Sequence, residues 1–293
     1  MSHKTEHEED ILDWLSLGYP QGDVAKHLGV SQSTVSRVAE RRRIAQTASS
    51  LQTVVALPDI HYPYQDKGSL AVVGEFLKDL QPNYIIYMGD QMDLEMLMNR
   101  RKGIPDTSSI VADYEGFNEI MEHHIKLCPG AKIIFLEGNH EYRVEFLLQE
   151  HPWLKGSGIE IAKYFRFKER QIEYVRYNKL YTLGKKSWTH GFYYNVHHAS
   201  KTVMQFYRCI SYGHTHDRQA YTQINPADIE DVHLAQSIGC LCNVNPNWRK
   251  NRPNRWVHGL EVTYIDKATG YFNDYFIKIT AGKFIFGGKC YGK

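Results

Sequence analysis

The chain has 293 residues, enough for about two domains. Its hydrophobic share of 42% and charged share of 23% are close to globular averages, which excludes a disordered or fibrous protein. The chain has no run of about 18 apolar residues, and its first residues lack the apolar core of a signal peptide. We therefore expect a cytoplasmic protein without a membrane partner. The net charge of +2 does not by itself indicate a nucleic-acid partner.

The cysteines are few, odd in number and not arranged in CxxC pairs. This pattern indicates reduced thiols in a cytosol and excludes both a disulfide framework and a zinc finger. The five are Cys128, Cys209, Cys240, Cys242 and Cys290, of which we interpret 240 and 242 as small buried residues at a strand end.

Residues 1–46 carry the pattern of three short helices and form the first predicted domain. The first helix ends near Gly18 and Pro20, and the second ends at Gly29. Ser31 is the expected N-cap of the third. Helix, glycine-containing turn and helix is the outline of a helix-turn-helix. Residues 25–37 resemble the helix-turn-helix of bacterial and phage DNA-binding proteins.

This resemblance implies contact with DNA, and a homodimer is possible because a lone helix-turn-helix often works in pairs. The start of the last helix would meet base edges, and basic residues further along would meet phosphates. An alternative is that the module only packs on the remainder of the chain or dimerises. The residues assigned to the groove are Gln32, Ser33, Thr34 and Arg37, and those assigned to the DNA backbone are Arg41, Arg42 and Arg43.

A linker is expected at residues 47–51, followed by one domain over 52–293. Strands predicted at 53–57, 84–87 and 132–136 alternate with helices near 70–80 and 110–127, an order that implies a parallel sheet. Further strands predict a second, mostly antiparallel sheet, at 172–176, 186–189, 209–212, 232–238, 257–265 and 271–280.

Polar groups follow five of these strands where each one ends. In open α/β sheets such strand ends converge on one ligand site. The set includes three aspartates, five histidines and one asparagine, too many ligands for one tetrahedral ion, and suits borderline to hard divalent metals. Two metals about 3.5–4 Å apart can share a carboxylate and stabilise phosphoryl transfer. The motifs are Asp59-x-His61, Gly89-Asp90-x-x-Asp93, Gly138-Asn139-His140-Glu141, His190-Gly191 and Gly213-His214-x-His216.

These five motifs, in this order, resemble the full motif set of the calcineurin-like metallophosphoesterases over roughly residues 52–280. The resemblance implies a four-layer α/β/β/α sandwich with two divalent metal ions. Manganese is favoured, with iron, zinc or magnesium as alternatives. It implies that one metal is held by Asp59, His61 and His216, the other by Asn139, His190 and His214, and that Asp90 bridges them. His140 would donate a proton to the leaving oxygen, oriented by Asp93.

One departure from the family pattern limits the classes of substrate that we expect. Protein-phosphatase members follow the second motif with Arg-Gly, whereas Leu94-Glu95 stands here, which argues against a protein phosphatase. Arg143 is a candidate replacement clamp for phosphate. The layout is similar to that of phosphoesterases in bacteriophage genomes, often called exonuclease-like. A phage-encoded protein would act in the host-cell cytoplasm.

The prediction is therefore a metal-dependent phosphodiesterase, most simply a nuclease acting on DNA. A hydroxide between the metals would attack phosphorus while His140 protonates the departing oxygen. A basic segment, residues 248–255, would add an approach for nucleic acid, with Trp248 and Trp256 able to stack on bases. The first alternative is a phosphomonoesterase or small-nucleotide phosphodiesterase that uses the helix-turn-helix for docking. The second is a non-catalytic DNA-binding regulator.

Overall fold

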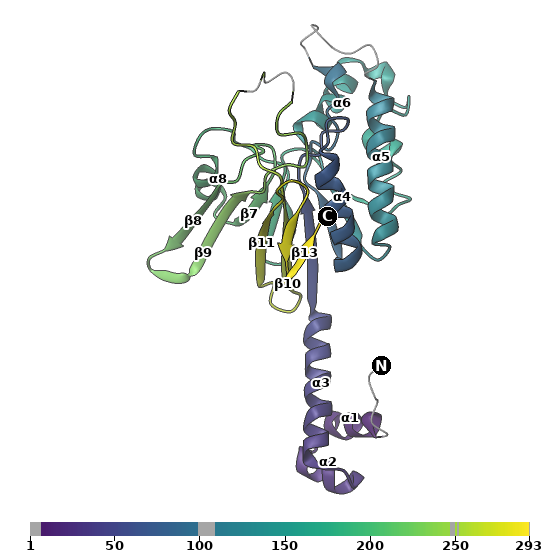
Figure 1. Ribbon diagram of the computed structural model, residues 1–293, viewed down its shortest axis with the longest axis vertical. Coiled ribbons are helices and arrows are strands. Elements are labelled where there is room, and N and C mark those ends of the chain that lie inside the picture. Colours follow the sequence, from purple (N-terminus) through teal and green to yellow (C-terminus); the bar gives the residue numbers. More distant parts are fainter. Residues whose placement is uncertain (1–6, 99–108, 247–249, 251, 293) are drawn as a thin grey trace. The chain divides into compact units, whose positions relative to one another are not determined.

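A computed structural model describes residues 7–98, 109–246, 250 and 252–292 (Figure 1). The chain divides into two compact units, residues 1–51 and 52–293. No helix within the described residues is long and apolar enough to cross a membrane.

The first unit consists of three helices, α1 (Glu8–Ser16), α2 (Gln21–Leu28) and α3 (Gln32–Ser50). Gly29 ends α2 with a left-handed φ of 66°. The Ser31 hydroxyl accepts the backbone N–H of Thr34 at 3.2 Å, which confirms Ser31 as a cap of α3. The expected linker at 47–51 is not a loop: α3 continues to Ser50, in a stretch without Gly or Pro to end it, and the next strand begins at once. The core of this unit is Ile11, Val24, Ala25, Val35 and Val38.

The first sheet of the larger unit has six strands in the order β11-β10-β1-β2-β3-β4. Strands β1 to β4 pair in parallel, as the alternation of strands and helices predicts, whereas β10 and β11 form an antiparallel pair. The strands are β1 (Leu51–Leu57), β2 (Tyr84–Tyr87), β3 (Lys132–Leu136), β4 (Glu173–Val175), β10 (Gly259–Asp266) and β11 (Phe272–Lys278).

The second sheet has five strands in the order β5-β6-β7-β9-β8. The prediction of a mostly antiparallel second sheet is wrong, because β6/β7 and β7/β9 pair in parallel and only β5/β6 and β8/β9 are antiparallel. Helix α8 (His198–Phe206) lies between β6 and β7 in the chain, and such a crossover makes two neighbouring strands parallel. The strands are β5 (Tyr181–Leu183), β6 (Lys186–Thr189), β7 (Cys209–Tyr212), β8 (Ala220–Asn225) and β9 (Asp228–Ser237).

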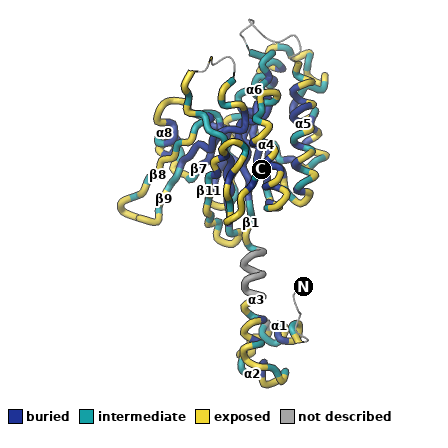
Figure 2. Tube along the Cα trace, in the orientation of Figure 1, coloured by how far each residue is buried: buried dark blue, intermediate teal, exposed yellow. Residues whose placement is uncertain are grey.

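The two sheets pack face to face, and helices cover their outer faces (Figures 1 and 2). Alternate side chains of β1 show the division: Val55 and Leu57 join the core under the helices, whereas Val54 and Ala56 join the core between the sheets. This confirms the predicted α/β/β/α sandwich. The helices on the first sheet are α4 (Lys67–Leu80) and α5 (Ile110–Leu127), and α8 packs on the second.

The remaining elements are short, apart from one helix that begins directly after β3. They are α6 (Asn139–Glu150), α7 (Ile161–Tyr164), the 3-10 helices η1 (Glu95–Leu97) and η2 (Pro152–Leu154), β12 (Phe284–Phe286) and β13 (Lys289–Tyr291).

Candidate metal centre

Polar side chains from the ends of β1, β2, β3, β6 and β7 converge at one edge of the two sheets. The backbone helps to direct them there, because five of these residues adopt a left-handed conformation that is unusual without glycine. They are Asp59, His61, Asp90, His214 and His216, with φ values of 45°, 51°, 50°, 67° and 58°. Such conformations persist only where the surrounding structure enforces them, and they are common at functional sites.

Two glycines allow the strand ends to approach each other closely. A Cβ atom on Gly138 would collide with the carboxylate of Asp90, and one on Gly213 would collide with that of Asp59. The absence of a side chain at both positions therefore leaves room for two buried carboxylates.

The first cluster gathers around His216. Its Nε2 lies 3.1 Å from Oδ1 of Asp59 and 3.2 Å from Nε2 of His61. Nε2 of His61 lies 3.8 Å from Oδ2 of Asp90. All four side chains are buried.

The second cluster gathers around His190. Its Nε2 lies 2.9 Å from Oδ1 of Asn139, 3.2 Å from Nδ1 of His214 and 3.3 Å from Oδ2 of Asp90. Asp90 therefore faces both clusters through one carboxylate oxygen. All seven residues expected to hold metals lie in these two groups.

The donor atoms suit divalent cations. In each cluster two imidazole nitrogens face each other at 3.2 Å, close to buried carboxylate oxygens. Nitrogen and oxygen donors of this kind are ligands for manganese, iron or zinc. Burial alone would raise the pKa of Asp90, but the nearby His140 and His190 outweigh it and hold that pKa well below its ordinary value. The carboxylate thus remains charged, as a metal ligand must be.

Two histidines are fixed so that Nε2 points into the site. Nδ1 of His190 lies 3.0 Å from the carbonyl oxygen of Met88, and Nδ1 of His61 lies 3.0 Å from Oδ1 of Asp93. A proton on Nδ1 in each contact leaves Nε2 free to bind a cation.

His140 lies at the edge of the same group, with Nε2 3.7 Å from Oδ2 of Asp90. Its Nδ1 lies 2.6 Å from the main-chain oxygen of Asp93 and 3.4 Å from the carboxylate of that residue. Both the main-chain oxygen and the carboxylate of Asp93 therefore face His140, although the carboxylate lies closer to His61 than to His140. Burial would lower the pKa of His140, but the charges of Asp90 and Asp93 raise it above the ordinary value.

Arg143 lies one turn further along α6, half-buried. Its Nη1 donates to the main-chain oxygen of Asp93 at 2.8 Å. The guanidinium group is therefore anchored on the loop that carries Asp90 and Asp93, beside the metal centre.

Glu141 lies within one of the five motifs, but the sequence pattern indicated no role for it. The carboxylate is fully buried and accepts four backbone N–H groups, those of Asp90, Gln91, Met92 and Gly138, at 2.7–3.2 Å. Burial and the charge of Asp90 raise its pKa to about 7. The position of an acidic residue inside a recognised motif could have indicated that Glu141 matters to the site, but its hydrogen-bond partners are known only from the fold.

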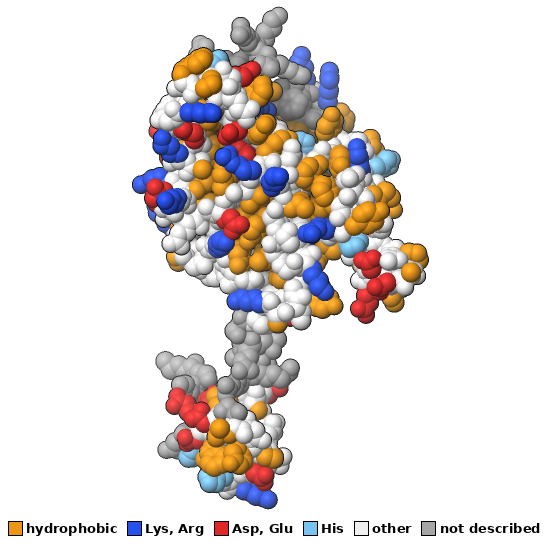
Figure 3. All heavy atoms as spheres, turned by 180° about the vertical axis from the view of Figure 1, so that it is seen from behind, with side chains coloured by type: hydrophobic (Ala, Val, Ile, Leu, Met, Phe, Trp, Pro, Cys, Tyr) orange, Lys and Arg blue, Asp and Glu red, His pale blue; other side chains and the backbone are white. Residues whose placement is uncertain are grey.

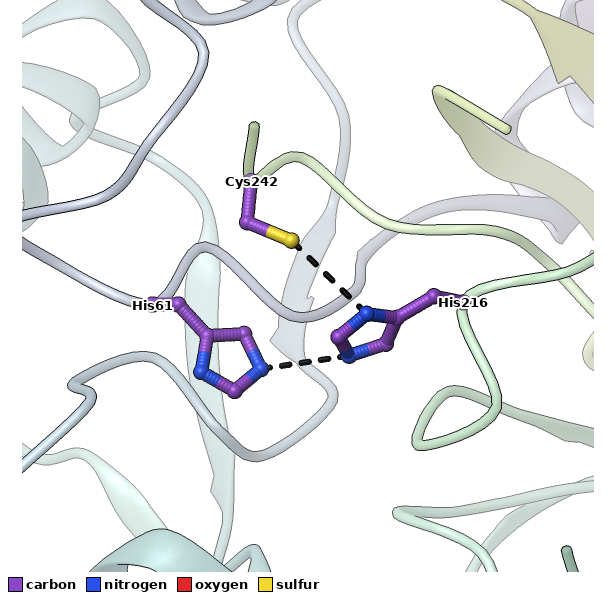
Figure 4. Close-up of side chains that lie close together, drawn as sticks. All are labelled: His61, His216 and Cys242. Atoms are coloured by element: carbon purple, nitrogen blue, oxygen red, sulfur yellow. Dashed lines mark hydrogen bonds between the residues drawn. The ribbon is translucent and has the colours of Figure 1, made fainter. Parts of the chain in front are cut away.

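Cys242 and Trp256 also surround the centre in a way that the sequence did not indicate. Cys242 is buried, as expected, and its Sγ lies 3.8 Å from Nδ1 of His216, whereas Nε2 of the same ring faces His61 (Figure 4). The ring of Trp256 packs edge-on against His216 with centroids 4.3 Å apart. The expected stacking of Trp256 on a base would thus compete with this contact, and Trp248 lies outside the described residues.

The N-terminal unit presents part of the predicted DNA-contacting set. Gln32, Ser33 and Arg37 are exposed, and Thr34 is half-buried with its hydroxyl 2.8 Å from that of Ser31. The side chains of Arg41, Arg42 and Arg43 lie outside the described residues.

Comparison with known proteins agrees with the geometry. The family model of the calcineurin-like phosphoesterases matches residues 52–264. The chain is also similar to the Gene 54 protein of Mycobacterium phage L5, with 23% identity over 261 residues, covering 81% of this chain and 98% of the phage protein.

Proposed function

The chain belongs to the calcineurin-like phosphoesterases, and from that premise we propose that it is a nuclease, a metal-dependent phosphodiesterase that hydrolyses DNA. The observation that carries the hydrolytic part is the position of Asp90, whose Oδ2 faces the His190 cluster at 3.3 Å and His61 at 3.8 Å. A carboxylate shared in this way is what a dinuclear centre requires.

We assign the ligands by cluster. Asp59, His61 and His216 would hold one cation, Asn139, His190 and His214 the other, and Asp90 both. Manganese is the favoured ion, with iron, zinc or magnesium compatible with the same donors. When bound, the two ions polarise the phosphoryl group and lower the pKa of a water nucleophile.

The residues of the chain supply orientation and proton transfer. His140 is the proposed proton donor to the leaving oxygen, because its Nδ1 is occupied by the main-chain oxygen of Asp93 at 2.6 Å while Nε2 faces the site. The charges of Asp90 and Asp93 raise the pKa of His140 above its ordinary value, which favours the protonated form that a proton donor needs. Arg143 is the proposed clamp for a phosphate oxygen, since its anchored guanidinium lies beside the same loop.

The choice of DNA rests on the first unit. Gln32, Ser33 and Arg37 lie exposed on the first two turns of α3, the position at which a helix-turn-helix meets base edges.

Acidic side chains of the larger unit, including Asp228 and Glu230, gather at the tip of the β8–β9 hairpin (Figure 3). That tip is the end of the hairpin opposite to the metal centre, so its charge lies away from the site where a phosphodiester would bind. A homodimer would give the two α3 helices neighbouring half-sites on one duplex.

The test compares DNA with small esters. End-labelled single- and double-stranded DNA, a bis-aryl phosphate and an aryl monophosphate are incubated with manganese and with wild-type protein or Asp90→Asn. We expect cleavage of DNA that the variant lacks. Hydrolysis of only the small esters would overturn the nuclease and favour a phosphomonoesterase or small-nucleotide phosphodiesterase. Salt-sensitive DNA binding without hydrolysis under any metal would favour a non-catalytic regulator.

A further inference from the structure

A recess of about 410 Å³ opens beside the metal centre along helix α6. Its lining includes Asn139, Tyr142, Arg143 and Phe146, with Leu97 and Met98 opposite. The helix residues are spaced by three, four and seven positions from Asn139, so they share one helical face. Because Asn139 also belongs to the His190 cluster, the recess adjoins the proposed reaction site.

Two aromatic rings line the recess, and one of them is held by a neighbouring ring. The ring of Tyr142 stacks on that of Tyr177, with centroids 4.9 Å apart and planes 26° apart. Phe146 remains 49% exposed, one turn beyond Arg143. An exposed aromatic ring next to a reaction centre offers a surface for a flat, uncharged group.

The two charged residues that line the recess lie towards its two ends. Arg143 marks the end next to the metal centre, where a phosphate would lie, and Glu150 marks the far end. A ligand that fits this order has an anionic phosphate first and a flat heterocycle about one helical turn away. A nucleotide has this form.

We propose that the recess binds the nucleobase of the nucleotide next to the scissile phosphate, with the base against Phe146 and Tyr142. This inference rests on the proposed function, because it takes the phosphodiester of DNA as the group at the metal centre. Bases of every kind have a stacking face, so the site would favour a base over none without selecting one sequence.

Three thymidine dinucleotides test the proposal: one complete, one without the 5′ base and one without the 3′ base, each base replaced by hydrogen on an abasic sugar. For the wild-type protein we expect removal of one of the two bases to lower kcat/KM roughly 5- to 100-fold, the range typical of one stacked base. Phe146→Ala should lower kcat/KM for the complete dinucleotide to nearly the level of that abasic analogue, and leave the analogue unchanged. Phe146→Tyr, which keeps the ring, should restore the preference.

Trp153→Ala is the matched control, because Trp153 is 75% exposed just beyond the end of α6 and does not line the recess. If Phe146→Ala lowered kcat/KM equally for all three dinucleotides, or kept the wild-type preference for the base, the recess would not bind the base. The proposal of a nuclease would be unaffected by either result. Hydrolysis of a bis-aryl phosphate with no cleavage of any dinucleotide would overturn both. A thermal melt of each variant confirms that the fold is retained.

Discussion

Oε2 of Glu141 accepts the backbone N–H of Asp90 at 2.8 Å. Through three further N–H groups the same carboxylate ties the start of α6 to the loop that follows β2. Glu141 thus fixes the backbone of the residue that both clusters share.

Glu141→Gln should destabilise the protein and weaken metal binding. An amide offers one acceptor oxygen in place of two, so its NH₂ group would face buried backbone donors. We expect a loss of about 2–3 kcal/mol in the free energy of unfolding, measured by urea denaturation. Metal affinity should fall at least about tenfold by titration. Glu145→Gln, on the same helix and paired with Arg176 at the surface, is the control. An unchanged urea midpoint for Glu141→Gln would contradict this role.

Asp90→Asn should abolish most hydrolysis and reduce the number of bound metal ions. The substitution keeps the shape of the side chain but removes the charge that faces both clusters. We expect kcat to fall by at least about 100-fold, with little change in melting temperature of the metal-free protein. Elemental analysis after dialysis reports the metal content. Asp79→Asn, a surface carboxylate paired with Lys289, should keep both activity and metal, and equal metal content in the two variants would refute the sharing of Asp90.

His124 should make the fold sensitive to acid. Burial, with a smaller effect of His123, lowers its pKa to about 3, against about 6.5 in an unfolded chain. Between these values the unfolded chain binds a proton that the folded one does not, so stability falls as pH decreases, by up to about 1.4 kcal/mol per unit. The His124→Phe variant has no side chain at this position that can bind a proton, so its free energy of unfolding should fall less than that of the wild type between pH 6 and pH 4. The variant also loses the contact of 2.9 Å between Tyr87 and His124, so its free energy of unfolding should be lower at pH 7.

Urea unfolding at pH 6, 5 and 4 measures that difference. His233→Gln, which replaces a half-buried histidine of β9 outside the core that holds His124, is the control. A parallel decline in His124→Phe and wild type would show that His124 does not carry the effect.

Arg37→Ala should weaken DNA binding. Arg37 is exposed on α3 at one of the positions assigned to base edges, and loss of one such contact costs about 1–3 kcal/mol, or roughly 5- to 150-fold in affinity. With Asp90→Asn as background to prevent cleavage, we expect a loss of affinity in that range at a fixed salt concentration. Lys26→Ala on α2 tests for a general loss of positive charge; an equal loss of affinity there would mean that α3 does not make the contact.

The sequence was most informative where the periodic pattern is long or the strand is fully buried. The helix at 110–127 and the strands at 84–87 and 132–136 match α5, β2 and β3 residue for residue. Because parallel strands end at one edge of a sheet, the motifs also predicted which side chains meet.

The pairing of the later strands was less predictable. Nothing local in β10 and β11 shows that they join the first sheet, because strand neighbours depend on long-range packing. Helix α8 was missed, and with it the parallel pairing of β6 and β7. The contacts of Glu141 with Asp90 and of Cys242 with His216 could not be read from the chain for the same reason, since these partners are 51 and 26 residues away.

At the left-handed positions of the metal centre, stability and function favour different residues. A glycine at Asp59, His61 or His216 would adopt its φ with little cost, whereas a side chain there costs on the order of 1–3 kcal/mol. Each of these proposed ligands is thus kept in place at the expense of the stability of the folded state. Selection for thermal stability alone would favour glycine at these positions, so a search for thermostable variants needs an activity screen to retain the site.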